Sequence, residues 1–154
     1  MRKIIILCCI ALLFACKSKK PAVVDVETTV VVVKPEAVET AKLNRAYDLG
    51  KRLLESCNTS NFKSFSASEA TEKVRQNATV DKISSICKKI NQRNGKFLGL
   101  NLFAITFNNQ TNEYIFHYNI NYNKKLYKRD LFVTINQDNK VSAITTKEVK
   151  PKPL

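Results

Sequence analysis

The ten residues 113–122, EYIFHYNINY, decide the fold of this chain. Large apolar and aromatic side chains occupy every second position from Tyr114 to Tyr122, and most positions between them are polar, such as His117 and Asn119. Side chains on a β-strand point alternately to its two faces, so this period of two is typical of a strand with one buried face. The stretch therefore predicts a strand of an antiparallel sheet whose aromatic face lies toward the core.

The segments on either side of this stretch predict the rest of the sheet. A strand over residues 97–107 precedes it, and strands over 127–135 and 141–149 follow, with polar turns at 108–112, 123–124 and 137–139. In the first strand the apolar residues are even-numbered up to Leu102 and odd-numbered from Phe103, which indicates a β-bulge that bends the sheet. We expect a curved four-stranded antiparallel meander.

The residues before the sheet follow a helical period. Apolar residues recur at helical spacing over residues 36–57 and again from Thr79, which can cap a helix that Gly95 ends. A short helix between them, capped by Ser66 or Ser68, ends near Gln76. We therefore predict an α+β fold in which three N-terminal helices pack on the meander. All four prolines lie outside the central region, which places the folded domain at residues 38–150 and a tail at 151–154.

The N-terminal residues have the layout of an export signal. Two basic residues precede a short apolar run, and Leu13-Phe14-Ala15-Cys16 is followed at once by polar residues. This segment resembles the lipobox of bacterial lipoproteins, which implies removal of residues 1–15 and lipidation of Cys16. An ordinary signal peptide with a chance cysteine is one alternative. An uncleaved anchor is the other, but the apolar run falls short of the roughly 20 residues that span a bilayer.

Residues 16–37 then read as a lipid-anchored tether between the membrane and the domain. Within it, Thr28 to Val33 reads TTVVVV, and β-branched residues favour an extended backbone. Three interpretations stay open for this stretch: a strand that docks on the domain, a strand that docks on a partner, or a stiff spacer.

The charge and the expected anchor together suggest partners. The chain carries 26 Lys and Arg against 13 Asp and Glu, a net charge of +13. A basic protein attracts anionic partners, yet an exported lipoprotein rarely meets nucleic acid, so we expect none. An envelope protein or an anionic surface polymer fits better, and a merely solvated basic surface is the alternative. We expect a cell-envelope lipoprotein, on the outer membrane and facing the periplasm, as a monomer or weak homodimer.

The cysteines divide by position. Cys8 and Cys9 leave with the signal, and Cys16 is the expected lipidation site, so only Cys57 and Cys87 remain as thiols in the domain. In an oxidising compartment an even pair favours a disulfide, whereas two buried free thiols are the alternative.

The order of elements resembles a known fold. A long helix, the stretch NFKSF at 61–65, two shorter helices and a meander are similar to the cystatin-like cone fold, which nuclear transport factor-like domains share. Small exported bacterial domains of unknown function within this fold resemble residues 40–148 through Gly95, the strand 114–122, the pair Lys124-Lys125 and the turn at 138–139. The resemblance implies a fold and no known activity.

The sequence contains few of the residue patterns that are typical of catalytic sites. It has no metal-binding motif and no phosphate-binding glycine loop, and its single histidine is His117, so we expect no metal and no cofactor. Alternation places His117 and Asp130 on the face opposite the aromatic one. We expect four tyrosines to line a pocket with their apolar rings and their hydroxyl groups: Tyr114, Tyr118, Tyr122 and Tyr127.

We therefore expect a non-catalytic binding module without a catalytic residue. The alternative is a small cone-fold enzyme that uses the pocket between the first helix and the sheet. Acid–base catalysis needs a titrating group with a partner. A contact between His117 and a carboxylate inside one concave pocket would therefore contradict the non-catalytic expectation.

Overall fold

The computed structural model of the 154-residue chain describes residues 30–125 and 127–149. The expected signal peptide, Cys16, most of the expected tether and the tail at 151–154 lie outside the described residues.

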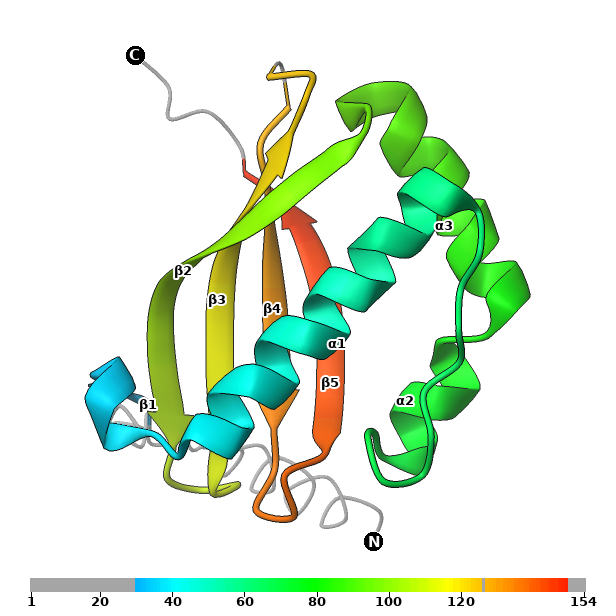
Figure 1. Ribbon diagram of the computed structural model, residues 1–154. Coiled ribbons are helices and arrows are strands. Elements are labelled where there is room, and N and C mark those ends of the chain that lie inside the picture. Colours follow the sequence, from blue (N-terminus) through cyan, green and yellow to red (C-terminus); the bar gives the residue numbers. More distant parts are fainter. Residues whose placement is uncertain (1–29, 126, 150–154) are drawn as a thin grey trace, which may run out of the picture.

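The core of the molecule is one antiparallel sheet, as the α+β prediction requires (Figure 1). Its strands lie side by side in chain order: β1 (Val30–Val33), β2 (Phe97–Asn108), β3 (Glu113–Tyr122), β4 (Arg129–Ile135) and β5 (Val141–Glu148).

The predicted number of four strands was wrong, because part of the expected tether joins the sheet. Residues Val30 to Val33 pair with β2, with Val33 opposite Ile105. The four valines thus form a strand that docks on the domain, and this strand covers the edge that β2 would otherwise expose.

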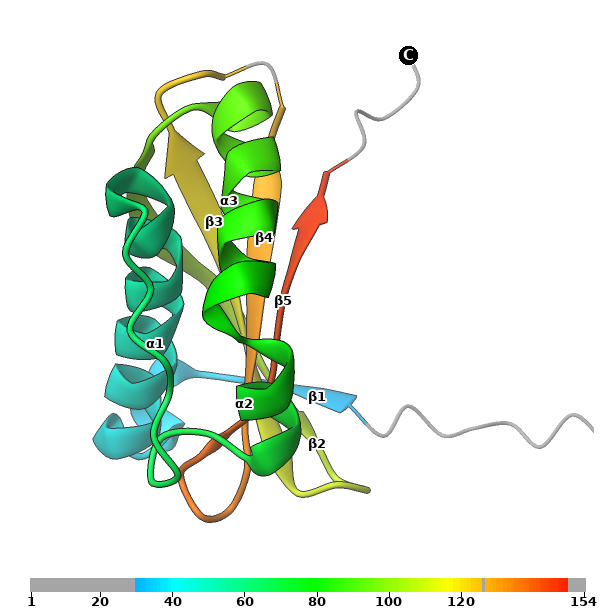
Figure 2. The same ribbon diagram turned by 90° about the vertical axis from the view of Figure 1, so that its right-hand side faces the viewer.

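The helices all lie on one side of the sheet (Figure 2). A short 3-10 helix, η1 (Pro35–Ala37), leads into α1 (Thr40–Thr59), and α2 (Glu72–Asn77) and α3 (Val80–Asn94) follow. The predicted cap of α3 is confirmed, because the Thr79 hydroxyl accepts a hydrogen bond from the Lys82 amide. Gly95 ends this helix with a positive φ of 78°, which favours glycine.

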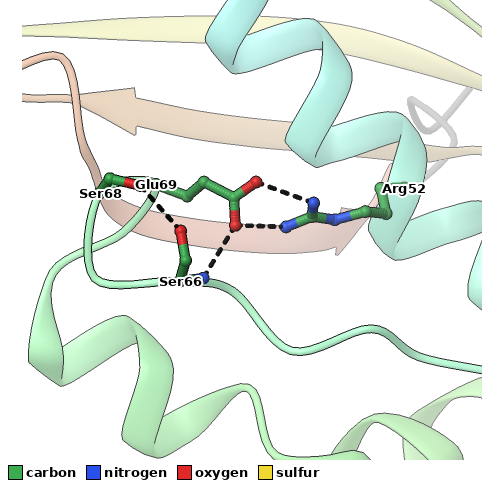
Figure 3. A network of polar contacts seen from close by, with 4 residues as sticks. All are labelled: Arg52, Ser66, Ser68 and Glu69. Carbon is green, nitrogen blue, oxygen red and sulfur yellow. Dashed lines mark hydrogen bonds and ion pairs between the residues drawn. The ribbon is translucent and has the colours of Figure 1, made fainter.

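The second helix begins later than predicted, because residues 66–70 form a turn instead (Figure 3). Both carboxylate oxygens of Glu69 accept hydrogen bonds from the Arg52 guanidinium on α1, each at 2.9 Å, and the Ser66 amide donates to the same carboxylate at 2.8 Å. Ala70 then forms an isolated bridge with Val141 at the start of β5. Side-chain and strand-like bonds thus take up the polar groups that a helix would have used.

The predicted aromatic face of β3 is buried against the helices. Phe116, Tyr118, Ile120 and Tyr122 are all buried, and they pack with Leu131 and its neighbours on β4. α1 approaches this face closely at Gly50, where an added Cβ would lie 2.7 Å from the Leu131 Cδ2 atom. The space between α1 and the sheet centre is therefore filled.

The predicted bulge in β2 is confirmed. The register with β3 shifts between Leu102 and Ala104, so the alternation restarts there. Phe103 lies at the shift and is 67% exposed, whereas Ile105 beyond it is buried. The bulge thus places one aromatic ring on the surface.

Tyr127 does not lie on the strand that the sequence predicted for it. β4 begins at Arg129, and Tyr127 precedes it with 42% of its surface exposed. The Tyr127 carbonyl accepts a hydrogen bond from the buried Asn94 side chain, and the Arg93 guanidinium lies 4.4 Å above the ring centroid. Tyr127 therefore packs against the end of α3 and does not pair with a neighbouring strand.

A disulfide joins Cys57 at the end of α1 to Cys87 in α3. Of the two states that the sequence left open, the structure has the bonded one. Nearby, the Asn58 side chain exchanges two hydrogen bonds with the backbone of Phe97, and it thereby ties the end of α1 to the start of β2.

Candidate functional site

The main candidate site is a cleft of about 640 Å³ bounded by all three α-helices and β5. It falls within the range of about 300–1,000 Å³ that is usual for small-molecule sites. Its walls are mostly apolar, and they include Leu53 and Leu54 of α1, Ile83, Ile86 and Ile90 of α3, and Ile144 of β5. We call it the helix–β5 cleft.

The cleft exists because the apolar stripe of α3 is wider than the core that covers it. Ile83, Cys87 and Ile90 are buried, whereas Val80 and Ile86 are each 49% exposed. Ile86 lines the cleft and Val80 does not. The sequence contained part of this signal, since apolar residues recur at helical spacing from Thr79. Within residues 30–125 and 127–149, no helix beyond those given above covers the whole stripe.

The charged side chains that line the cleft are all cationic. Lys73 of α2 and Arg129 of β4 belong to its lining, and the lining includes no carboxylate and no histidine. Arg129 donates a hydrogen bond to the Thr146 hydroxyl at 2.9 Å and forms an ion pair with Glu148 at 3.6 Å, and its buried Nε atom has no hydrogen-bond partner. A buried donor without a partner costs free energy that an additional acceptor would recover. The cleft therefore suits a ligand that combines an apolar body with an anionic group.

None of the four tyrosines expected in a pocket lines the helix–β5 cleft. Tyr118 and Tyr122 are buried in the core, and burial raises the pKa of both phenols, that of Tyr122 to about 12. Tyr114 packs on Phe107 of β2. Tyr122 and Tyr127 instead border a second cavity. The three tyrosines of β3 do not line the cleft because β3 is the central strand of the sheet, whereas the cleft lies along β5.

Most lining residues of this second cavity lie on the face of the sheet away from the helices, and we call it the outer cavity. His117 and Asp130 both line it, and the His117 Nε2 atom lies 2.8 Å from a carboxylate oxygen of Asp130. Alternation predicted their face correctly but not their contact, which follows from the pairing of β3 with β4. The contact between a histidine and a carboxylate that catalysis would require is therefore present on this face, and the non-catalytic role stays a prediction.

Other kinds of site find no support in the part of the chain that the structure describes. There, no three His, Cys, Asp or Glu side chains gather closely enough to hold a metal ion. Within the same residues, no helix is both long and apolar enough to cross a membrane.

Comparisons of the chain with protein-family models, with curated proteins and with solved structures give no match.

Proposed function

We propose that this protein is a lipid-anchored binding module of the cell envelope, and that it holds an anionic single-chain amphiphile in the helix–β5 cleft. One observation carries the proposal: an apolar cleft of about 640 Å³ whose charged lining residues, Lys73 and Arg129, are both cations. The apolar walls would bury an acyl chain at about 25 cal/mol per Å² of apolar surface. The cations would hold its head group and select against positively charged amphiphiles.

The place of action rests on the lipobox-like stretch, which supports an anchor at Cys16 on the outer membrane, facing the periplasm. The disulfide between Cys57 and Cys87 supports export independently, because such bonds persist in oxidising compartments. The bulged sheet under one long helix supports the proposed relation to cystatin-like cone domains.

The proposal is tested with the chain lacking residues 1–16, which removes the competing lipid. Dodecanoate should displace a fluorescent acyl probe with saturation, and dodecyltrimethylammonium should do so at least about tenfold more weakly. Ile86→Asp places a charge in the apolar wall and should weaken dodecanoate binding by more than about tenfold.

The matched control is Val80→Asp, since Val80 is equally exposed on the same helix but lies outside the cleft. Lys73→Glu should also weaken binding, and Lys89→Glu, on the solvent side of α3, should not. Equal effects of Ile86→Asp and Val80→Asp would contradict the proposal.

The contact between His117 and Asp130 favours a second candidate function, acid–base catalysis in the outer cavity. A histidine oriented by a carboxylate is a common arrangement for general base catalysis. Hydrolysis of a panel of chromogenic esters, phosphoesters and glycosides tests it. Turnover that His117→Gln abolishes, with an unchanged melting temperature, would establish this candidate over a purely binding role.

A further inference from the structure

The outer cavity has the features of a second ligand site, separate from the helix–β5 cleft. It measures about 560 Å³, and β2, β3, β4 and the hairpin before β4 all contribute to its lining. The helices cover only one face of the sheet (Figure 2). Most lining residues of the outer cavity, such as His117 and Asp130, lie on the other face, whereas Arg129 lines both cavities.

An ordered aromatic and polar cluster forms one wall of this cavity. The His117 ring stacks on Phe132 at a centroid distance of 4.4 Å, and the ring of Phe103 meets it edge-on at 4.8 Å. Asp130 is held in place because one of its oxygens contacts His117 and the other accepts a hydrogen bond from Asn119 at 3.0 Å. The cluster therefore presents fixed groups, whereas Phe103 leaves two thirds of its surface free, at 67% exposure.

Side-chain amides lie beside the aromatic ring. Asn101 of β2 is directly opposite Asn119 of β3, and Asn121 lies two residues further along the same strand. All three line the cavity and are exposed. Each amide offers both donors and acceptors, which match the paired hydroxyl groups of a sugar ring.

Positive charge borders the same cavity. Lys124, Lys125 and Lys128 are exposed and belong to its lining, and the lining contains one carboxylate, that of Asp130. Because Asp130 already contacts His117 and Asn119, the lysines keep a net positive charge toward a ligand. An exposed aromatic ring, a group of amides and lysines together match the apolar face, the hydroxyls and the carboxylate of a sugar acid.

We infer that the outer cavity binds an acidic polysaccharide, in which Phe103 packs against a sugar ring, the asparagines bind hydroxyls and the lysines bind carboxylates. This inference stands independently of the proposed amphiphile, since the two sites share no lining residue except Arg129.

Binding of the full-length protein in non-ionic detergent to immobilised polygalacturonate tests the inference. Phe103→Ala should weaken binding by about three- to tenfold. Leu98→Ala is the matched control, because Leu98 lies on the same strand with the same exposure of 67% and does not line the cavity. Lys128→Ala should weaken binding more than Lys89→Ala, and Ile86→Asp should leave it unchanged.

Two other polymers separate the contribution of the sugar rings from that of the carboxylates. Dextran, which has sugars without charge, should bind much more weakly than polygalacturonate, and so should polyacrylate, which has carboxylates without sugars. Polyacrylate binding as tightly as polygalacturonate would reduce the site to general charge attraction and overturn the inference. Equal losses for Phe103→Ala and Leu98→Ala would overturn it as well.

Discussion

The ionised carboxyl group of Glu69 stabilises the fold through its contacts with Arg52 and Ser66. Hydrogen bonds from Arg52, and then from Ser66, lower the pKa of Glu69 from 4.5 to about 2 (Figure 3). A carboxyl group with a lowered pKa in the folded state stabilises the fold fully above its unfolded pKa. That contribution should be lost as the pH falls from about 4.5 to about 2.

Glu69→Gln should therefore lower the free energy of unfolding at pH 7 by about 1–3 kcal/mol. It should also reduce the acid-induced loss of stability between these pH values. Glu55→Gln, which removes only an exposed pair with Lys51, should cost less than about 1 kcal/mol. Urea unfolding at pH 7 and at pH 3 measures both variants. A pH dependence identical in Glu69→Gln and the wild-type protein would contradict this assignment.

At the scale of single residues, the sequence predicts faces better than contacts. Alternation placed His117 and Asp130 on the outer face, but only the pairing of β3 with β4 brings them within 2.8 Å. Lysine side chains usually face solvent, yet Lys42 of α1 is buried and paired with Glu39. Such contacts depend on which residues of neighbouring strands pair and on where each helix ends. Neither can be read directly from one sequence.

Among the elements, the packing of α1 on the sheet depends on Gly50. An added Cβ would lie 2.7 Å from the Cδ2 atom of the buried Leu131, so either that side chain or α1 must shift. Gly50→Ala should destabilise the protein by about 1–3 kcal/mol. Gly99→Ala is the control, because an added Cβ there has no atom within 4 Å. Thermal unfolding of both variants tests the prediction, and equal melting temperatures would count against close packing at Gly50.

The disulfide between α1 and α3 should be the strongest single cross-link between these elements. The two cysteines are separated by 30 residues, and closing such a loop stabilises a fold by about 3–4 kcal/mol in the chain-entropy model. We expect that value to be lost in the double variant Cys57→Ala, Cys87→Ala. Peptide mapping of the protein isolated from its native cells, without reducing agent, should find the two cysteines linked. Two free thiols there would rule out the bond.

Element type was largely predictable, and element number was not. The change of period from helical spacing to alternation separated the helices from the strands, and the parity switch at Phe103 located the bulge. The run of valines at 30–33 allowed three interpretations, because its β-branched residues fix an extended backbone but not a neighbour. Pairing with β2 decided among them. Predicting the cleft likewise required the position of α3 relative to β5, and this position could not be read from the sequence.

At the scale of the whole molecule, the proposed lipid anchor at Cys16 would decide where the domain acts. Cys16→Ala should abolish incorporation of a labelled fatty acid and leave unprocessed precursor, because the acylated thiol is missing. Each buried methylene of an acyl chain contributes about 0.8 kcal/mol to membrane binding, so the variant should also lose stable membrane attachment. Metabolic labelling and membrane fractionation measure both effects. Normal labelling of the variant would contradict a lipid anchor at this residue.

The central claim is that the helix–β5 cleft binds an anionic amphiphile, and isoleucine-methyl NMR during a dodecanoate titration tests it most directly. Ile83, Ile86, Ile90 and Ile144 line the cleft, and Ile115 lies on the outer face of β3 as an internal control. We predict saturable shifts of the four cleft methyls, an unchanged Ile115 methyl, and no shifts in the Ile86→Asp variant. Shifts that do not saturate, or that are largest at Ile115, would contradict the claim.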